Sequence, residues 1–153
     1  MATQPDFVLY DRYGRLAAVI EIKAKRGTSS RWAAEFRRNL LAYETFRYAP
    51  LFLLVTPDRL YLWKSEVPKD SEADLAPVFP DYAIDAKLVF ERYLQGAGVR
   101  LEEISGPAFE LIVMSWLEDL IHQWPEALRH TQLEGSGLDE AAKNGRITYP
   151  AAA

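Results

Sequence analysis

The sequence predicts an α/β sandwich in which helices flank a mixed β-sheet. Strand-like and helix-like segments follow one another along the chain in the order strand, strand, helix, strand, strand, helices. A continuous apolar run at 51–55 is typical of a strand covered on both faces, and a wide apolar stripe at 107–123 is typical of a helix packed on a core. With 153 residues, the chain has the length of one domain.

The first predicted unit is an antiparallel β-hairpin. An aromatic and β-branched run at 7–10 leads through a Gly-containing turn at 11–15 into a second strand at 16–25. Gly27-Thr28-Ser29-Ser30 breaks that strand and supplies hydroxyl caps for a helix at 31–48. The predicted buried stripe of this helix is Trp32, Phe36, Leu40 and Tyr43.

Three further regions follow this first unit. Strands are expected at 51–55 and 60–64, which completes a core over residues 1–64. An acidic loop at 65–84 then leads to C-terminal helices within 85–132, at about 85–95 and 107–123. The stripe of the second helix is Phe109, Val113, Trp116, Leu117, Leu120 and Ile121. Residues 133–153 are expected to be a partly disordered tail.

Composition excludes several kinds of chemistry. The chain has no cysteine, so disulfides, thiolate zinc sites and cysteine nucleophiles are ruled out, and a reducing cytoplasm is the expected compartment. We also expect no membrane association, because no apolar stretch is long enough to span a bilayer. The net charge is -4, but residues 1–64 carry 11 Lys/Arg against 6 Asp/Glu. This basic half indicates a surface that can bind a phosphate backbone.

Two acids and a lysine are the candidate catalytic residues. Along the strand, Glu21 and Lys23 share one face while their apolar neighbours share the other, and Asp6 opens the partner strand. Carboxylates from Asp6 and Glu21, with the Ile22 carbonyl, form an oxygen-rich site suited to Mg²⁺ or Mn²⁺. A lysine beside such a metal orients the attacking water and offsets charge on a phosphorane.

The pattern Pro5-Asp6, fifteen residues, then Glu21-Ile22-Lys23 resembles the PD-(D/E)xK nuclease superfamily. The span from Pro5 to Lys64 is most similar to the nuclease domains of type I restriction motor subunits. The resemblance implies a restriction-endonuclease-like fold, metal binding by Asp6 and Glu21, and activation of water by Lys23. Relatives often carry Gln-x-x-x-Tyr on the next helix, where this chain has Asn39 and Tyr43 as candidate accessory residues.

The resemblance also implies DNA as the partner. The candidate DNA-binding residues are Lys25, Arg26, Arg31, Arg37 and Arg38. In the superfamily a helix precedes the Pro-Asp strand, and only four residues precede Pro5 here. Another element must therefore cover the part of the sheet that this helix covers in the superfamily. We expect that element to be the helix at 107–123, or to come from a homodimer partner or a larger complex.

Three functions are consistent with the sequence. The leading one is divalent-metal-dependent hydrolysis of DNA, through Asp6, Glu21 and Lys23. The second is a catalytically inactive nuclease-like module that binds DNA or protein, which the substitution at Asn39 favours. The third is a protein-interaction domain that oligomerises through the 107–123 helix.

Overall fold

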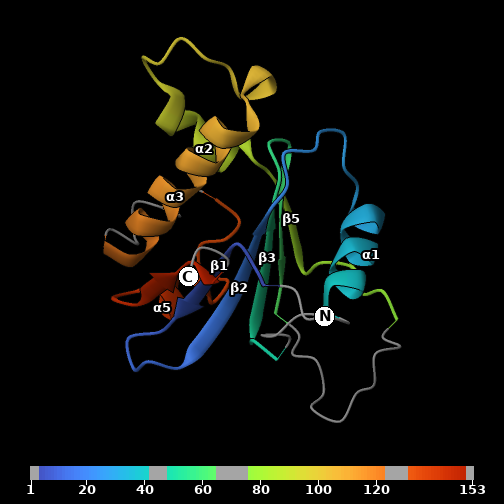
Figure 1. The fold of residues 1–153 in the computed structure, drawn as a ribbon, viewed down its shortest axis with the longest axis vertical. Coiled ribbons are helices and arrows are strands. Elements are labelled where there is room, and N and C mark those ends of the chain that lie inside the picture. The colour runs from blue at the N-terminus through green and yellow to red at the C-terminus, as the bar shows by residue number, and fades with distance from the viewer. Residues whose placement is uncertain (1–3, 42–47, 65–75, 123–130, 151–153) are drawn as a thin grey trace.

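The protein forms three layers, with a mixed six-stranded sheet between two layers of helices. A computed structural model describes residues 4–41, 48–64, 76–122 and 131–150. Figure 1 shows the sheet nearly edge-on, with α1 on one side and α2 and α3 on the other. The α/β class and the helix-flanked mixed sheet expected from the sequence are confirmed at this level.

The sheet has the strand order β5-β4-β3-β2-β1-β6. Its strands are β1 (Phe7–Tyr10), β2 (Leu16–Ile22), β3 (Leu51–Val55), β4 (Arg59–Trp63), β5 (Tyr82–Asp85) and β6 (Arg146–Thr148). Only β2 and β3 are parallel, and the other neighbours are antiparallel. The helix α1 (Ser30–Leu41) lies between β2 and β3 in the chain, as a parallel crossover requires.

The face of the sheet opposite α1 carries the larger core. It is covered by α2 (Lys87–Phe90), α3 (Gly106–His122) and α5 (Leu138–Ala142), together with the 3-10 helices η1 (Glu91–Leu94) and η2 (Leu101–Glu103). All six predicted stripe residues of α3 are buried, so that prediction is confirmed. Trp116 and Phe109 both make edge contacts with the Phe90 ring, at centroid distances of 5.4 and 5.6 Å. The apolar stripe of α3 is therefore buried within one chain, so it gives no reason to expect a homodimer.

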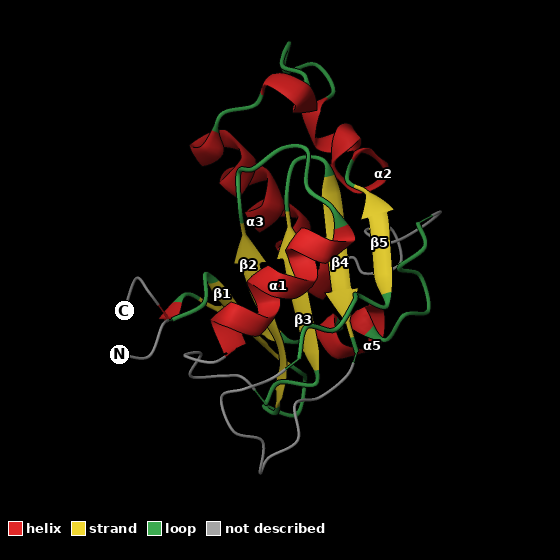
Figure 2. Ribbon diagram, turned by 90° about the vertical axis from the view of Figure 1, so that its right-hand side faces the viewer, coloured by secondary structure: helices red, strands yellow, loops and turns green. Residues whose placement is uncertain are grey.

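The α1 face is organised differently from the predicted stripe. The buried residues of α1 are Ala33, Ala34, Arg37 and Leu41, while Trp32, Phe36 and Leu40 are only half-buried. The sheet itself supplies large rings on this side, from Phe52, Tyr61 and Trp63. Because these rings fill the space beneath α1, close packing leaves room there mainly for alanines. Trp32 and Phe36 therefore lie toward the flank of the helix. Figure 2 shows α1 crossing this face of the sheet.

Two predictions about the second half of the chain are wrong. The expected loop at 65–84 contains most of β5, which pairs with β4 along the edge of the sheet. The expected tail contributes α5 and β6, and β6 pairs with β1 through Leu9 and Ile147. Leu133, Leu138 and Ala142 are fully buried in the larger core. Residues 131–150 are therefore part of the fold.

Within the described ranges, no helix combines the length and apolar character that crossing a bilayer requires.

Candidate metal and nuclease site

Asp6 and Glu21 lie opposite each other at the same end of two neighbouring strands. The antiparallel register pairs Phe7 with Ile20, so the next pair along is Asp6 and Glu21. The Asp6 backbone N–H donates to Glu21 Oε1 at 3.2 Å, and the Ile22 backbone N–H donates to Asp6 Oδ2 at 2.8 Å. Two acids that are fifteen residues apart in the sequence are thus fixed side by side.

Pro5 explains why the Ile22 carbonyl receives no main-chain hydrogen bond from the residue opposite it. Continuing the register places Pro5 opposite Ile22, and proline has no N–H to donate to the Ile22 carbonyl. The Asp6 carboxylate accepts the Ile22 N–H, which an antiparallel ladder would otherwise give to the main chain of its partner. In an extended strand the N–H and C=O of one residue point to the same side. The Ile22 carbonyl therefore also points toward the β1 side, where Asp6 lies.

Glu21 is the more deeply placed of the two acids. Glu21 is 6% exposed, whereas Asp6 is half-buried. A carboxylate removed from water needs hydrogen-bond donors or a cation to offset the loss of hydration. The arrangement places negative charge and oxygen ligands together at the strand ends, which is the chemistry that a hard divalent cation requires.

Lys23 follows the same face of the sheet immediately beyond β2. Its backbone N–H donates to the Val55 carbonyl at 2.9 Å, which extends the pairing of β2 with β3 by one residue. Its Nζ lies 5.3 Å from the centre of the Phe36 ring, so the side chain is on the α1 side together with Glu21. Lys23 is exposed and follows Glu21 on the same face, and the Phe36 ring is the contact observed for its ammonium.

The ligand atoms available at this site are oxygens, the type that Mg²⁺ and Mn²⁺ prefer. Asp6 and Glu21 supply carboxylate oxygens, and the Ile22 carbonyl supplies a neutral one. Across the described residues no cluster of three or more Asp, Glu, His or Cys side chains is placed to hold a metal. Any ion here would therefore complete its coordination with water, as Mg²⁺ commonly does.

The candidate DNA-binding residues separate into two groups. Lys25, Arg31 and Arg38 are exposed; Lys25 Nζ lies 5.2 Å from the Trp32 ring centre, and Arg38 donates to Asn39 Oδ1 at 2.9 Å. Arg26 instead donates through Nη2 to the carbonyls of Leu101 and Ile104, at 3.2 and 2.8 Å. Arg26 is also exposed and its guanidinium anchors the segment around η2, and its contact with phosphate stays a prediction.

Arg37 is the clearest correction to the predicted site. The sequence suggests Arg37 as a DNA-binding residue, but it is 6% exposed and its guanidinium lies over the rings of Phe52 and Trp63, at 5.7 and 5.3 Å. Burial lowers the pKa of Arg37 to about 10, and the nearby Asp81 charge opposes that shift. A guanidinium held beneath the helix cannot reach a phosphate backbone.

The accessory pair is only partly described. Asn39 is exposed and accepts the hydrogen bond from Arg38. Tyr43 lies outside the described residues. The proposed relation between these two positions therefore stays a prediction.

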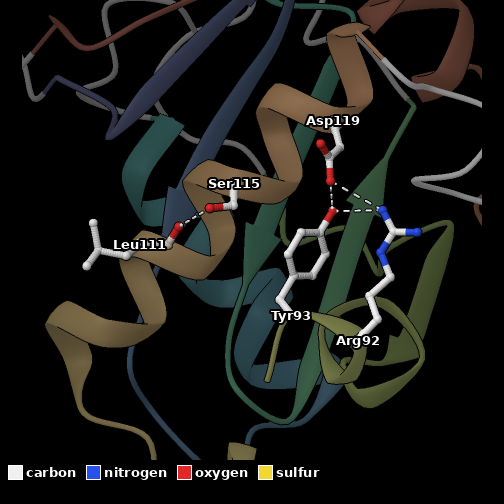
Figure 3. Close-up of polar contacts among 5 residues, drawn as sticks. All are labelled: Arg92, Tyr93, Leu111, Ser115 and Asp119. Carbon is white, nitrogen blue, oxygen red and sulfur yellow. Dashed lines mark hydrogen bonds and ion pairs between the residues drawn. The ribbon is translucent and has the colours of Figure 1, made fainter. Parts of the chain in front are cut away.

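A second polar cluster, absent from the sequence interpretation, lies on the opposite face of the sheet. Figure 3 shows Tyr93, Arg92 and Asp119 in mutual contact: the Tyr93 hydroxyl donates to the Asp119 carboxylate, and Arg92 donates to both. Burial, followed by the bond to Asp119, raises the pKa of Tyr93 to about 12. The cluster joins η1 to α3, and only the fold brings its members together, because Asp119 is 26 residues from Tyr93.

Comparisons of this chain with protein-family models, with curated proteins and with solved structures found no match.

Proposed function

We propose that this chain is a divalent-metal-dependent nuclease of the PD-(D/E)xK type that hydrolyses DNA phosphodiester bonds. The observation that carries the proposal is the reciprocal bonding of Asp6 and Glu21 across two strands, with Lys23 next on the same face. A restriction-endonuclease-like arrangement of the sheet is part of the proposal. It is supported by α1 directly after the Glu21-Ile22-Lys23 strand and by α3 on the opposite face.

Each residue has a distinct role in this mechanism. Asp6, Glu21 and the Ile22 carbonyl would hold Mg²⁺ or Mn²⁺, which polarises a phosphate oxygen and lowers the pKa of water. Lys23 orients that water and offsets the negative charge of the pentacovalent phosphorane. The water gives up a proton as its oxygen bonds to phosphorus, one ester P–O bond breaks, and the leaving oxygen takes up a proton.

Cleavage by purified variants tests the proposal. Wild type is incubated with single-stranded, duplex and supercoiled DNA, in Mg²⁺, in Mn²⁺ or in EDTA. We expect metal-dependent cleavage that falls at least about 100-fold in Glu21→Gln, since the metal ligand is lost while side-chain size is kept. Glu110→Gln is the matched control, because Glu110 is an exposed glutamate of α3 on the other side of the sheet.

The second candidate function is a nuclease-like module that binds DNA without cleaving it, and a DNA-binding measurement beside the cleavage assay tests it. The observation in its favour is that an oxygen of each carboxylate already accepts a main-chain N–H bond. DNA binding without cleavage in either metal would establish this second function. Cleavage that persists in EDTA, or that Glu21→Gln and Glu110→Gln reduce equally, would contradict the assigned site.

A further inference from the structure

Two stacked aromatic side chains of α1 lie on the face of the sheet to which Val19 and Glu21 of β2 also point. The Trp32 and Phe36 rings have centroids 5.4 Å apart and planes inclined by 28°. Both side chains contact the core on the α1 face, yet both are only half-buried. Part of each side chain is therefore accessible from outside.

Exposed lysines connect this aromatic pair to the candidate site. Lys25 Nζ lies over the Trp32 ring at 5.2 Å, and Lys23 Nζ lies over the Phe36 ring at 5.3 Å. Lys23 is also the residue placed next to Glu21 for catalysis. Contacts therefore run from Trp32 through Phe36 to Lys23, which is two residues beyond Glu21 in the chain.

The charge around the pair suits a polyanion. Arg31 and Arg38 are exposed on α1, and Glu35 is the one acid in the described span of this helix. With Lys23 and Lys25, these arginines give the flank of α1 a positive character. Aromatic rings alternating with cations are the usual composition of surfaces that bind single-stranded nucleic acid.

We propose that Trp32, supported by Phe36, is a stacking platform for an unpaired base of DNA, with Lys25 binding an adjacent phosphate. The inference rests on the proposed function and narrows its substrate to single-stranded or locally unwound DNA. In a duplex both faces of an internal base are covered by its neighbours, so a protein ring can stack only on an unpaired or terminal base. The exposed Lys25 side chain can move from the ring to the phosphate as the base takes its place.

Binding in EDTA tests the platform separately from cleavage. The full chain is titrated into a labelled single strand of about 20 nucleotides, and separately into the matching duplex, and fluorescence anisotropy gives each Kd. We expect tighter binding to the single strand, and a roughly ten-fold weaker Kd for that strand in Trp32→Leu. Trp32→Tyr keeps a stacking ring and should stay within about three-fold of wild type.

Tyr13→Leu is the matched control. Tyr13 is 65% exposed with Arg12 and Arg15 each 5.0 Å from its ring centre, but it lies in the hairpin turn at the far end of β1 and β2. Its loss should change the single-strand Kd by less than about two-fold, because it is not part of the platform. Circular dichroism must show that every variant is folded at the assay temperature.

Three outcomes would overturn the platform. The first is equal affinity of wild type for the single strand and the duplex. The second is an equal loss of single-strand affinity in Trp32→Leu and Tyr13→Leu. The third is a Trp32→Leu variant that melts at a lower temperature but keeps the wild-type Kd. Any of these leaves metal-dependent cleavage intact as a separate result. Conversely, failure of cleavage with Trp32-dependent binding would refute the nuclease and keep the platform.

Discussion

Asp6 and Glu21 are joined through the main chain: the Asp6 N–H donates to a Glu21 carboxylate oxygen at 3.2 Å, and the Asp6 carboxylate accepts the N–H that follows Glu21. Each acid therefore fixes the position of the other before any cation arrives. Pre-organisation of this kind reduces the conformational entropy that ligand binding would otherwise cost. It also means that substitutions here must preserve an acceptor if folding and metal binding are to be separated.

The first prediction is a metal-dependent change in stability. Metal that binds only the folded state stabilises it by about 2.7 kcal/mol at 100 times its Kd. For a chain of this size that is a rise in Tm of roughly 5–10 °C. We expect Mn²⁺ to raise the Tm of wild type and of Glu110→Gln by this amount, and to have little effect on Glu21→Gln. Equal rises in all three proteins would place the metal elsewhere.

Arg37 and Arg38 are adjacent arginines for which we predict opposite behaviour. Arg37→Ala removes a buried side chain from the rings of Phe52 and Trp63 and leaves a cavity, and should cost about 2–4 kcal/mol. Arg38→Ala, at an exposed position, should cost less than about 0.5 kcal/mol. Urea unfolding measures both. A destabilised Arg38→Ala beside a neutral Arg37→Ala would mean that α1 is rotated relative to this structure.

Two glycines test whether the C-terminal segment belongs to the fold. A Cβ on Gly145 would lie 2.4 Å from the Tyr10 carbonyl oxygen, so Gly145→Ala forces β6 away from β1 and should cost about 1–3 kcal/mol. A Cβ on Gly106 would meet only Ala24, at 3.6 Å, an ordinary contact. Gly106→Ala should therefore be neutral or stabilise by up to about 1 kcal/mol. If Gly145→Ala unfolds at the wild-type urea concentration, β6 does not pair with β1 in solution.

The sequence predicted those elements whose pattern is strong within their own residues. The hairpin strands and β3 are apolar runs bounded by turn residues, and the six-residue stripe of α3 has a helical period, so their burial follows from their own residues. The rotation of α1 was not predictable, because it depends on large rings contributed by β3 and β4. For the same reason Arg37 was misplaced and Trp32 was assigned to the core.

Strands at the sheet edges were missed because their signals are weak. In β5 only Ile84 is buried, and β6 has three residues beside a glycine. Pairing with β4 and β1 stabilises them, and such pairing leaves little trace in a short segment. For the candidate site, the strand period placed Glu21 and Lys23 on one face and suggested Asp6 opposite them. The reciprocal main-chain bonds required the register itself.

The last prediction concerns pH and the Tyr93–Asp119 contact. Burial and the bond to Asp119 raise the pKa of Tyr93 to about 12 in the folded protein, above its ordinary value of 10.0. A raised pKa means that the folded state holds the proton more tightly. Its contribution to stability is therefore complete below pH 10 and is lost as the pH rises toward 12. Because the side chain is only partly buried, we expect this contribution to be at most about 1 kcal/mol.

Urea unfolding from pH 8 to pH 12 should show a steeper loss of stability in wild type than in Tyr93→Phe, which has no proton to release. Parallel curves for the two proteins over this range would show that Tyr93 has the same pKa in the folded and unfolded states, and that its contact with Asp119 contributes nothing.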